Sequence, residues 1–164
     1  LKYVDREMKK GAAGYVFFKL NHLTDAKIIK RIQEAADAGV KFDLIVRTTY
    51  GLLPHPNIRA VSILDRYLEH QRVFLFGVGK DRRVYMSSSD LMERNLDSRV
   101  EVAFPILNGR LQQEVADMMA LQVADDSKAR ILDEKQVNAY VGHGDRRVQY
   151  DTYEYLRKLG EWKA

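Results

Sequence analysis

The chain has 164 residues, which suits a single domain over residues 1–164 with a proper core, or a piece of a longer enzyme. It contains no Cys, so disulfides, thiolate metal sites and thiol nucleophiles are excluded. Its net charge of +4 favours an anionic partner such as nucleic acid, nucleotide, polyphosphate or an acidic lipid surface, although the same charge also serves solubility. No apolar stretch approaches the roughly 20 residues that span a bilayer. Because the chain opens with Leu1 and not Met, we expect a fragment of a longer protein.

The first third of the chain predicts a strand, a helix and a second strand. Tyr15 to Leu20 is a compact aromatic and aliphatic run, typical of a buried strand. Thr24 or Asp25 can cap a following helix, and Gly39 ends it. Lys41 to Arg47 is the next strand. Such short joins predict a right-handed parallel crossover unit.

The middle of the chain predicts a loop followed by short strands. The segment from Thr48 to Asn57 contains Gly and Pro residues that favour a loop, and Ile58 to Ile63 alternates enough to form a short strand. Arg72–Phe76 and Arg83–Ser87 flank a short turn and predict an antiparallel hairpin. We expect one more strand over Ser98–Phe104.

The last third predicts a helix, two short extended pieces and a final helix. Asn108 can cap an amphipathic helix. Its apolar residues are Leu111, Val115, Met118 and Met119. Extended pieces follow near 129–132 and 137–141, and 150–159 predicts the last helix. The whole pattern indicates one α/β domain with a mixed β-sheet flanked by helices.

The segment around His70 carries the first candidate chemistry. His70 and Arg72 are two residues apart on a segment that we expect to be extended, so both side chains should point to one face. An imidazole with a pKa near ~6.5 suits proton transfer, and the guanidinium supplies a fixed cation. A lone histidine is more often structural than catalytic, so the argument rests on this pairing.

Polar residues beyond the hairpin complete the candidate site. The run Ser87–Asp90 offers hydroxyl and backbone donors, and Arg99 follows shortly after it. This combination suits the stabilisation and protonation of phosphate oxygens, because phosphoryl transfer depends mostly on positioning and electrostatics. Glu101 or Asp90 could orient the imidazole. Glu69 is a poorer candidate, because adjacent residues of a strand face opposite sides.

Two further cations follow from the crossover unit. Lys19 and Arg47 each lie where we expect the carboxyl end of a strand, and open α/β sheets bind ligands at those ends. The planar guanidinium of Arg47 would bind a phosphate through parallel hydrogen bonds, and the ammonium of Lys19 would act as a point charge. Either residue alone is better explained as a cation that reaches solvent. Together with His70 and Arg99 they favour a phosphate-binding site.

An ordered set of motifs extends this interpretation. They are Lys19-Leu20-Asn21, the strand Asp43–Arg47, Leu68–Arg72, Tyr85–Asp90 and Arg94–Val102. In this order and over nearly the whole chain, they resemble the last catalytic domain of bacterial polyphosphate kinase of the large, histidine-phosphorylating type. The resemblance implies a phospholipase D-like fold, in which a histidine precedes a basic residue by two positions and a small-residue turn follows. His70, Arg72 and Ser88 would occupy those positions.

The resemblance also implies an activity. This activity is reversible transfer of the terminal phosphate of ATP to polyphosphate, with ATP/ADP and Mg²⁺ as cofactors, through a phosphohistidine in a preceding domain that this chain lacks. His70 would then be a second histidine that acts as general acid or base and contacts phosphate. Arg47 resembles the ATP-phosphate arginine and Arg99 another basic residue of the channel. The further candidate ATP- and phosphate-binding residues are Lys19, Asn21, Arg72, Ser88 and Asp90.

The same resemblance implies a biological setting. The partners would be ATP, polyphosphate and the upstream domains of the same enzyme, which we expect to form a homo-oligomer, with no specific nucleic acid. We expect a cytoplasmic location, with attachment at the membrane periphery left open. The fragment alone should be inactive. This chain departs from the family after Arg47, where Thr48–Pro54 forms a shorter loop in place of a Gly- and Cys-containing stretch.

Two other functions fit the residues. One is a phospholipase D-like phosphodiesterase, in which two identical chains pair their His70 sites; Arg72 in place of the usual lysine counts against it. The other is a non-enzymatic module that binds polyanions through its basic charge.

Overall fold

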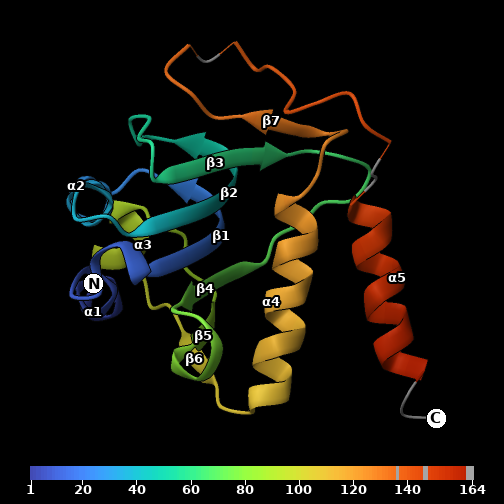
Figure 1. Ribbon diagram of the computed structural model, residues 1–164, viewed down its shortest axis with the longest axis horizontal. Coiled ribbons are helices and arrows are strands. Elements are labelled where there is room, and N and C mark those ends of the chain that lie inside the picture. The colour runs from blue at the N-terminus through green and yellow to red at the C-terminus, as the bar shows by residue number, and fades with distance from the viewer. Residues whose placement is uncertain (136, 146–147, 162–164) are drawn as a thin grey trace.

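A mixed β-sheet forms the middle layer of the protein, with helices on both of its faces, as predicted (Figure 1). The structure is a computed structural model that describes residues 1–135, 137–145 and 148–161. Within these residues the sheet has seven strands in the order β6-β5-β4-β1-β2-β3-β7. The pairs β1–β2 and β2–β3 are parallel, and the other neighbours are antiparallel.

The elements have the following bounds. The strands are β1 (Tyr15–Leu23), β2 (Lys41–Tyr50), β3 (Ile58–Ile63), β4 (Arg72–Phe76), β5 (Arg83–Ser87), β6 (Ala103–Ile106) and β7 (Ala129–Ile131). The α-helices are α1 (Lys2–Met8), α2 (Ala26–Asp37), α3 (Glu93–Asp97), α4 (Gly109–Val123) and α5 (Val148–Glu161). None of the described helices is long and apolar enough to cross a membrane.

The predicted strand–helix–strand unit is confirmed as a parallel β1-α2-β2 unit. Of the two candidate caps, Asp25 is the one used: its Oδ1 accepts a hydrogen bond from the backbone N–H of Ile28 over 2.8 Å. Gly39 follows the helix with a φ of +98°, a left-handed conformation that other residues rarely adopt. The cap and the glycine therefore set the length of α2, as the sequence predicts.

The sheet buries one apolar layer on each face, because successive strand residues point to opposite sides. On one face, Phe18 of β1 packs in a core that includes Ile32 of α2. On the other face, Phe17 and Ile45 lie in a core with Met119 of α4. Figure 1 shows α1 and α2 beside the first face and α4 and α5 beside the second.

The prediction of a loop from Thr48 onward is wrong for its first three residues. β2 continues to Tyr50, because Thr49 and Tyr50 still pair with His22 and Leu23 of β1. The loop therefore starts at Gly51. The strands Ile58–Ile63, Arg72–Phe76 and Arg83–Ser87 have the predicted bounds, and the hairpin β4–β5 is antiparallel.

The predicted strand over Ser98–Phe104 is also wrong in most of its length. The segment begins after the short helix α3, and only the residues from Ala103 onward pair with β5. Ser87 at the end of β5 is the partner of Ala103, so no strand residue remains to pair with 98–102. Val100 in this stretch is fully exposed.

The end of the chain follows its prediction in part. Asn108 caps α4, and the predicted strand near 129–132 and the final helix are β7 and α5. The predicted extended piece near 137–141 contributes only a single bridge, between Tyr140 and Arg130. The pair Arg146-Arg147, which we interpret from the sequence as a solvated turn, lies outside the described residues.

Strand β2 provides a test of this core. Leu44 of β2 is 0% exposed and belongs to the same apolar core as Phe18 and Ile32. We expect Leu44→Ala to lower the free energy of unfolding by about 2–5 kcal/mol, because it removes buried methyl groups and leaves a cavity. Urea unfolding of the 164-residue chain would measure this. Leu107→Ala is the matched control at a site that is 86% exposed, and an equal loss for both variants would contradict the assigned core.

Candidate functional site

His70 lies in the loop before β4, which corrects the expectation that it sits in a strand with an apolar setting. β4 begins only at Arg72, and the imidazole of His70 is exposed. The pairing of β1 with β4 ends at Lys19 and Val73, so the residues before Arg72 leave the sheet. The expected approach of the two side chains nevertheless occurs. Arg72 Nη1 lies 3.3 Å from His70 Nδ1, and Arg72 Nη2 lies 3.4 Å from His70 Nε2.

Arg72 connects this imidazole to the end of β1. Its Nη2 donates to Asp90 Oδ2 over 2.9 Å in an ion pair that is largely shielded from solvent. Asp90 Oδ1 in turn accepts hydrogen bonds from the backbone N–H groups of Asn21, at 2.7 Å, and His22, at 3.3 Å. Asn21 also donates through its side-chain Nδ2 over 3.2 Å. These contacts fix the orientation of the guanidinium that lies against His70.

The environment of Asp90 favours its ionised form. Burial alone would raise the pKa of this carboxyl group, but the hydrogen bonds from Arg72, Asn21 and His22 outweigh it and hold the pKa below its ordinary value. Asp90 therefore stays a charged partner of Arg72. Neither Asp90 nor Glu101 makes a direct contact with His70 among the interactions of the described residues, so Asp90 acts on the imidazole through Arg72.

A second polar group lies around Ser88 and Glu101. The hydroxyl of Ser88 donates to Glu101, and the Nδ2 of Asn95 donates to the other carboxylate oxygen over 2.8 Å. These hydrogen bonds, from Ser88 first, and the charges of Arg99 and Arg72 lower the pKa of Glu101. The exposed Arg99 is thus electrostatically linked to the same region as Arg72. Ser88 is a partner of Glu101 in this arrangement.

Lys19 lies in the interior of β1, which runs on to Leu23, and not at the carboxyl end where we expected it. Its side chain is 5% exposed, and its ammonium is held by Glu69 and by the side-chain oxygen of Gln122. Burial lowers the pKa of Lys19, and the charge of Arg47 lowers it further, while Glu69 opposes both effects. The buried ammonium of Lys19 therefore neutralises the partly buried carboxylate of Glu69 from inside the sheet.

Arg47 also lies within its strand, three residues before the end of β2. The hydroxyl of Ser62 on the neighbouring strand donates to its carbonyl oxygen over 2.8 Å. The Nε atom of Arg47 is buried and has no hydrogen-bond partner among the described residues. Arg47 as a whole is half-buried, and none of the ion pairs of the described residues includes it.

Sequence reasoning missed Gln122 and did not predict the ion pair between Glu69 and Lys19. Gln122 is fully buried and occupies the apolar face of α4, seven residues after Val115 and three after Met119. A glutamine at that helical spacing was the available signal. The prediction that Glu69 does not orient His70 is consistent with the contacts of the described residues, but the reason differs: Glu69 lies in a loop, and its carboxylate turns inward to Lys19.

The carboxylates of this region do not form a metal site. Among the described residues, no three His, Asp or Glu side chains gather closely enough to hold a metal ion. Asp90, Glu69 and Glu101 are each engaged by the partners given above. A magnesium ion usually binds through substrate phosphates together with one or two carboxylates. Magnesium stays a prediction, and we assign no step of the chemistry to a metal held by the described residues.

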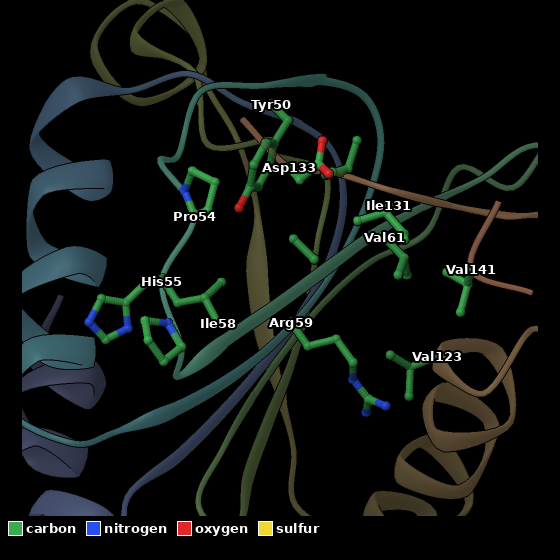
Figure 2. A pocket seen from close by; sticks show the side chains of 13 residues that line it. Tyr50, Pro54, His55, Ile58, Arg59, Val61, Val123, Ile131, Asp133 and Val141 are labelled. Atoms are coloured by element: carbon green, nitrogen blue, oxygen red, sulfur yellow. The ribbon is translucent and has the colours of Figure 1, made fainter. Parts of the chain in front are cut away.

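A separate pocket of about 420 Å³ lies at the edge formed by β3 and β7 (Figure 2). Apolar side chains such as Pro54, Ile58 and Val141 form much of its wall. Its polar residues are engaged elsewhere, since Arg59 pairs with Asp43 at 2.6 Å and His55 lies 3.3 Å from Asp37. None of the predicted site residues lines this pocket. The candidate site is therefore the polar region around His70 and Arg72.

Comparison with known proteins identifies the family of the chain. Residues 1–151 match the family model described as "Polyphosphate kinase C-terminal domain 2". The chain belongs to this family. The polyphosphate kinase of Escherichia coli (strain K12) is 42% identical over 167 residues, which cover 95% of this chain and 24% of that relative.

Solved structures place the domain within its fold. The crystal structure of polyphosphate kinase from Porphyromonas gingivalis matches 99% of this chain and 26% of that chain, with a TM-score of 0.93 and 37% identity. Nuc from Salmonella typhimurium, a phospholipase D family member, matches 80% of this chain and 89% of its own, with a TM-score of 0.58 and 12% identity. The likeness to Nuc concerns the fold alone. This polyphosphate kinase domain is therefore phospholipase D-like in fold, and it spans about a quarter of the length of the polyphosphate kinases it matches.

The buried ion pair of Asp90 gives a pH-dependent test. We expect Asp90→Asn to lower the free energy of unfolding by about 1.5–3 kcal/mol at pH 7, because hydrogen bonds to a charged group are lost. The folded-state pKa of Asp90 lies below its ordinary 3.8. The contribution is therefore present above pH 3.8 and is lost as the pH falls through the lower folded pKa.

Urea unfolding at a series of pH values from 7 downward would measure this difference. The exposed Asp97 provides the control, and Asp97→Asn should change stability by no more than about 0.5 kcal/mol. A gap between wild type and Asp90→Asn that widens at acidic pH would show that the ion pair is wrongly assigned.

Proposed function

We propose that this chain supplies the C-terminal part of a polyphosphate kinase active site. In the longer enzyme, the terminal phosphate of ATP is transferred reversibly to polyphosphate through a phosphohistidine in a preceding domain. The observation that carries the proposal is the placement of an exposed imidazole, His70, against a guanidinium that Asp90 holds in place. The family membership of the chain supports the substrates, which are ATP/ADP and polyphosphate.

In this proposal His70 exchanges a proton with an oxygen of the transferring phosphate, or donates a hydrogen bond to it. Arg72 fixes the position of the imidazole and adds positive charge behind it. Arg47 contributes a guanidinium to the phosphates of ATP, and the exposed Arg99 binds the polyphosphate chain. Such groups act mainly by positioning and by electrostatic stabilisation of charge that develops on oxygen.

Other candidate residues contribute through their neighbours. Asp90 holds Arg72, Asn21 near the end of β1 donates to Asp90, and Ser88 donates to Glu101. Magnesium would enter with the substrate phosphates or at residues outside this chain. We also propose that the remaining domains of the enzyme are partners, that the longer chain forms a homo-oligomer, and that it acts in the cytoplasm.

The first test removes the imidazole. In a chain that carries upstream polyphosphate kinase domains joined to residues 1–164, we expect His70→Ala to abolish detectable ATP-dependent polyphosphate synthesis, because the proposed proton-transfer group is lost. The measurement is polyphosphate formed from ATP over time. His143→Ala replaces another exposed histidine and should leave synthesis unchanged. Retained synthesis by His70→Ala would sink the proposed mechanism.

The second test concerns Arg47. Loss of one oriented electrostatic donor typically costs about 2.7–4 kcal/mol of transition-state stabilisation. We therefore expect Arg47→Ala in the same longer chain to lower kcat/KM for ATP by about 100- to 1,000-fold. Arg59→Ala is the matched control, because Arg59 also lies on the sheet but pairs with Asp43 beside the separate pocket. Equal activity of Arg47→Ala and Arg59→Ala would show that Arg47 does not contribute to the site.

A further inference from the structure

The loop that carries His70 is held to the protein interior by Glu69, the residue that precedes His70. Glu69 turns inward, and its carboxylate binds the ammonium of Lys19. The same ammonium donates to the side-chain oxygen of Gln122, which is fully buried on α4. One buried cation thus joins a central strand, a helix and the loop.

A second attachment lies two residues earlier. The side chain of Gln149 on α5 accepts a hydrogen bond from the backbone N–H of Tyr67 and donates to its carbonyl oxygen, both over 2.8 Å. Gln149 is itself buried, with 3% of its surface exposed. The backbone at Tyr67 is therefore held by α5, the side chain of Glu69 is held by Lys19 of β1, and His70 is the next residue along the chain.

The buried pair is poorly explained by stability. Taking an ammonium and a carboxylate out of water costs about as much as their attraction returns, and apolar residues of similar size often serve equally well. The Nε2 of Gln122 is also buried without a partner among the described residues, which is a further cost. The ion pair between Lys19 and Glu69, together with Gln122, serves instead to fix the conformation of the chain around it. The segment that it fixes here leads to His70.

We propose that Lys19 is a positioning residue that, with Gln122 and Gln149, fixes residues 67–69 and thereby sets the place of the His70 imidazole. This inference rests on the proposed function. It replaces the expected role of Lys19 as a phosphate ligand, because the ammonium is enclosed by Glu69 and Gln122. Lys19 acts on the reaction through the loop and does not touch substrate.

The test separates positioning from charge balance. In the longer chain that carries upstream domains, Lys19→Met leaves Glu69 as an unpaired buried charge, so both Tm and kcat should fall. The double variant Lys19→Met/Glu69→Gln removes both charges, and its Tm should return close to that of the wild type. Its kcat should stay about 10- to 100-fold low, with KM for ATP within about twofold, because a displacement near 1 Å at a reacting group costs up to about 100-fold.

Hydrogen–deuterium exchange on the same proteins gives a readout that needs no activity. We expect the amides of residues 67–70 to exchange faster in the double variant, while the core strands keep their protection. Arg31→Met, which breaks a surface ion pair with Asp5 on the other face of the sheet, should change neither kcat nor exchange in this loop.

Two results would overturn the inference. Recovery of kcat together with Tm in the double variant would show that Lys19 only balances the charge of Glu69 and does not position the loop. Unchanged exchange over residues 67–70 would show that the pair does not hold the loop. If the wild-type longer chain makes no polyphosphate, the proposed function fails, and the exchange measurement still decides whether Lys19 positions the loop.

Discussion

The ion pair between Arg72 and Asp90 is the interaction on which the site depends. It joins the first residue of β4 to the polar segment after β5, and Asp90 is tied in turn to the end of β1 by backbone hydrogen bonds. The imidazole of His70 rests against the same guanidinium. The pair therefore ties the start of the hairpin to the end of β1 and fixes the guanidinium against which the imidazole lies.

The cations of this region have different tasks, which burial and pairing separate. Lys19 and Arg72 are enclosed and paired, so they hold other protein groups in place. Arg99 is exposed and Arg47 is half-buried, and none of the ion pairs of the described residues includes either of them. A phosphate chain gains most from cations of the second kind, because a paired cation would have to give up a protein carboxylate first.

The sequence predicted much of the fold because local signals and tertiary structure agree there. The Asp25 cap, the helix that Gly39 ends and the β4–β5 hairpin all appear where capping and alternation place them. The errors arise where pairing partners decide. Residues 48–50 remain in β2 because β1 continues beside them, whereas 98–102 leave the sheet because β5 has ended.

The site was predictable to a similar degree and for a similar reason. The His70–Arg72 contact follows from a spacing of two residues, which survives even though His70 lies outside the strand. The partners of Lys19 did not follow, because they come from a loop and a helix 50 and 103 positions away. Only the tertiary fold brings such groups together, although a glutamine on the apolar face of α4 indicates a buried polar contact.

The exposure of His70 is the feature that connects the structure of this domain to its proposed role. An imidazole that moves protons to a phosphate oxygen works best where water is excluded and cations surround it. The guanidinium of Arg72 lies against the imidazole, which is otherwise exposed. A site that this domain forms on one side only suits a domain that spans about a quarter of the length of its relatives, since a facing surface can come from the rest of such a chain. The contacts that hold residues 67–69 then have a clear use, because they keep the loop in its conformation when no facing surface is present.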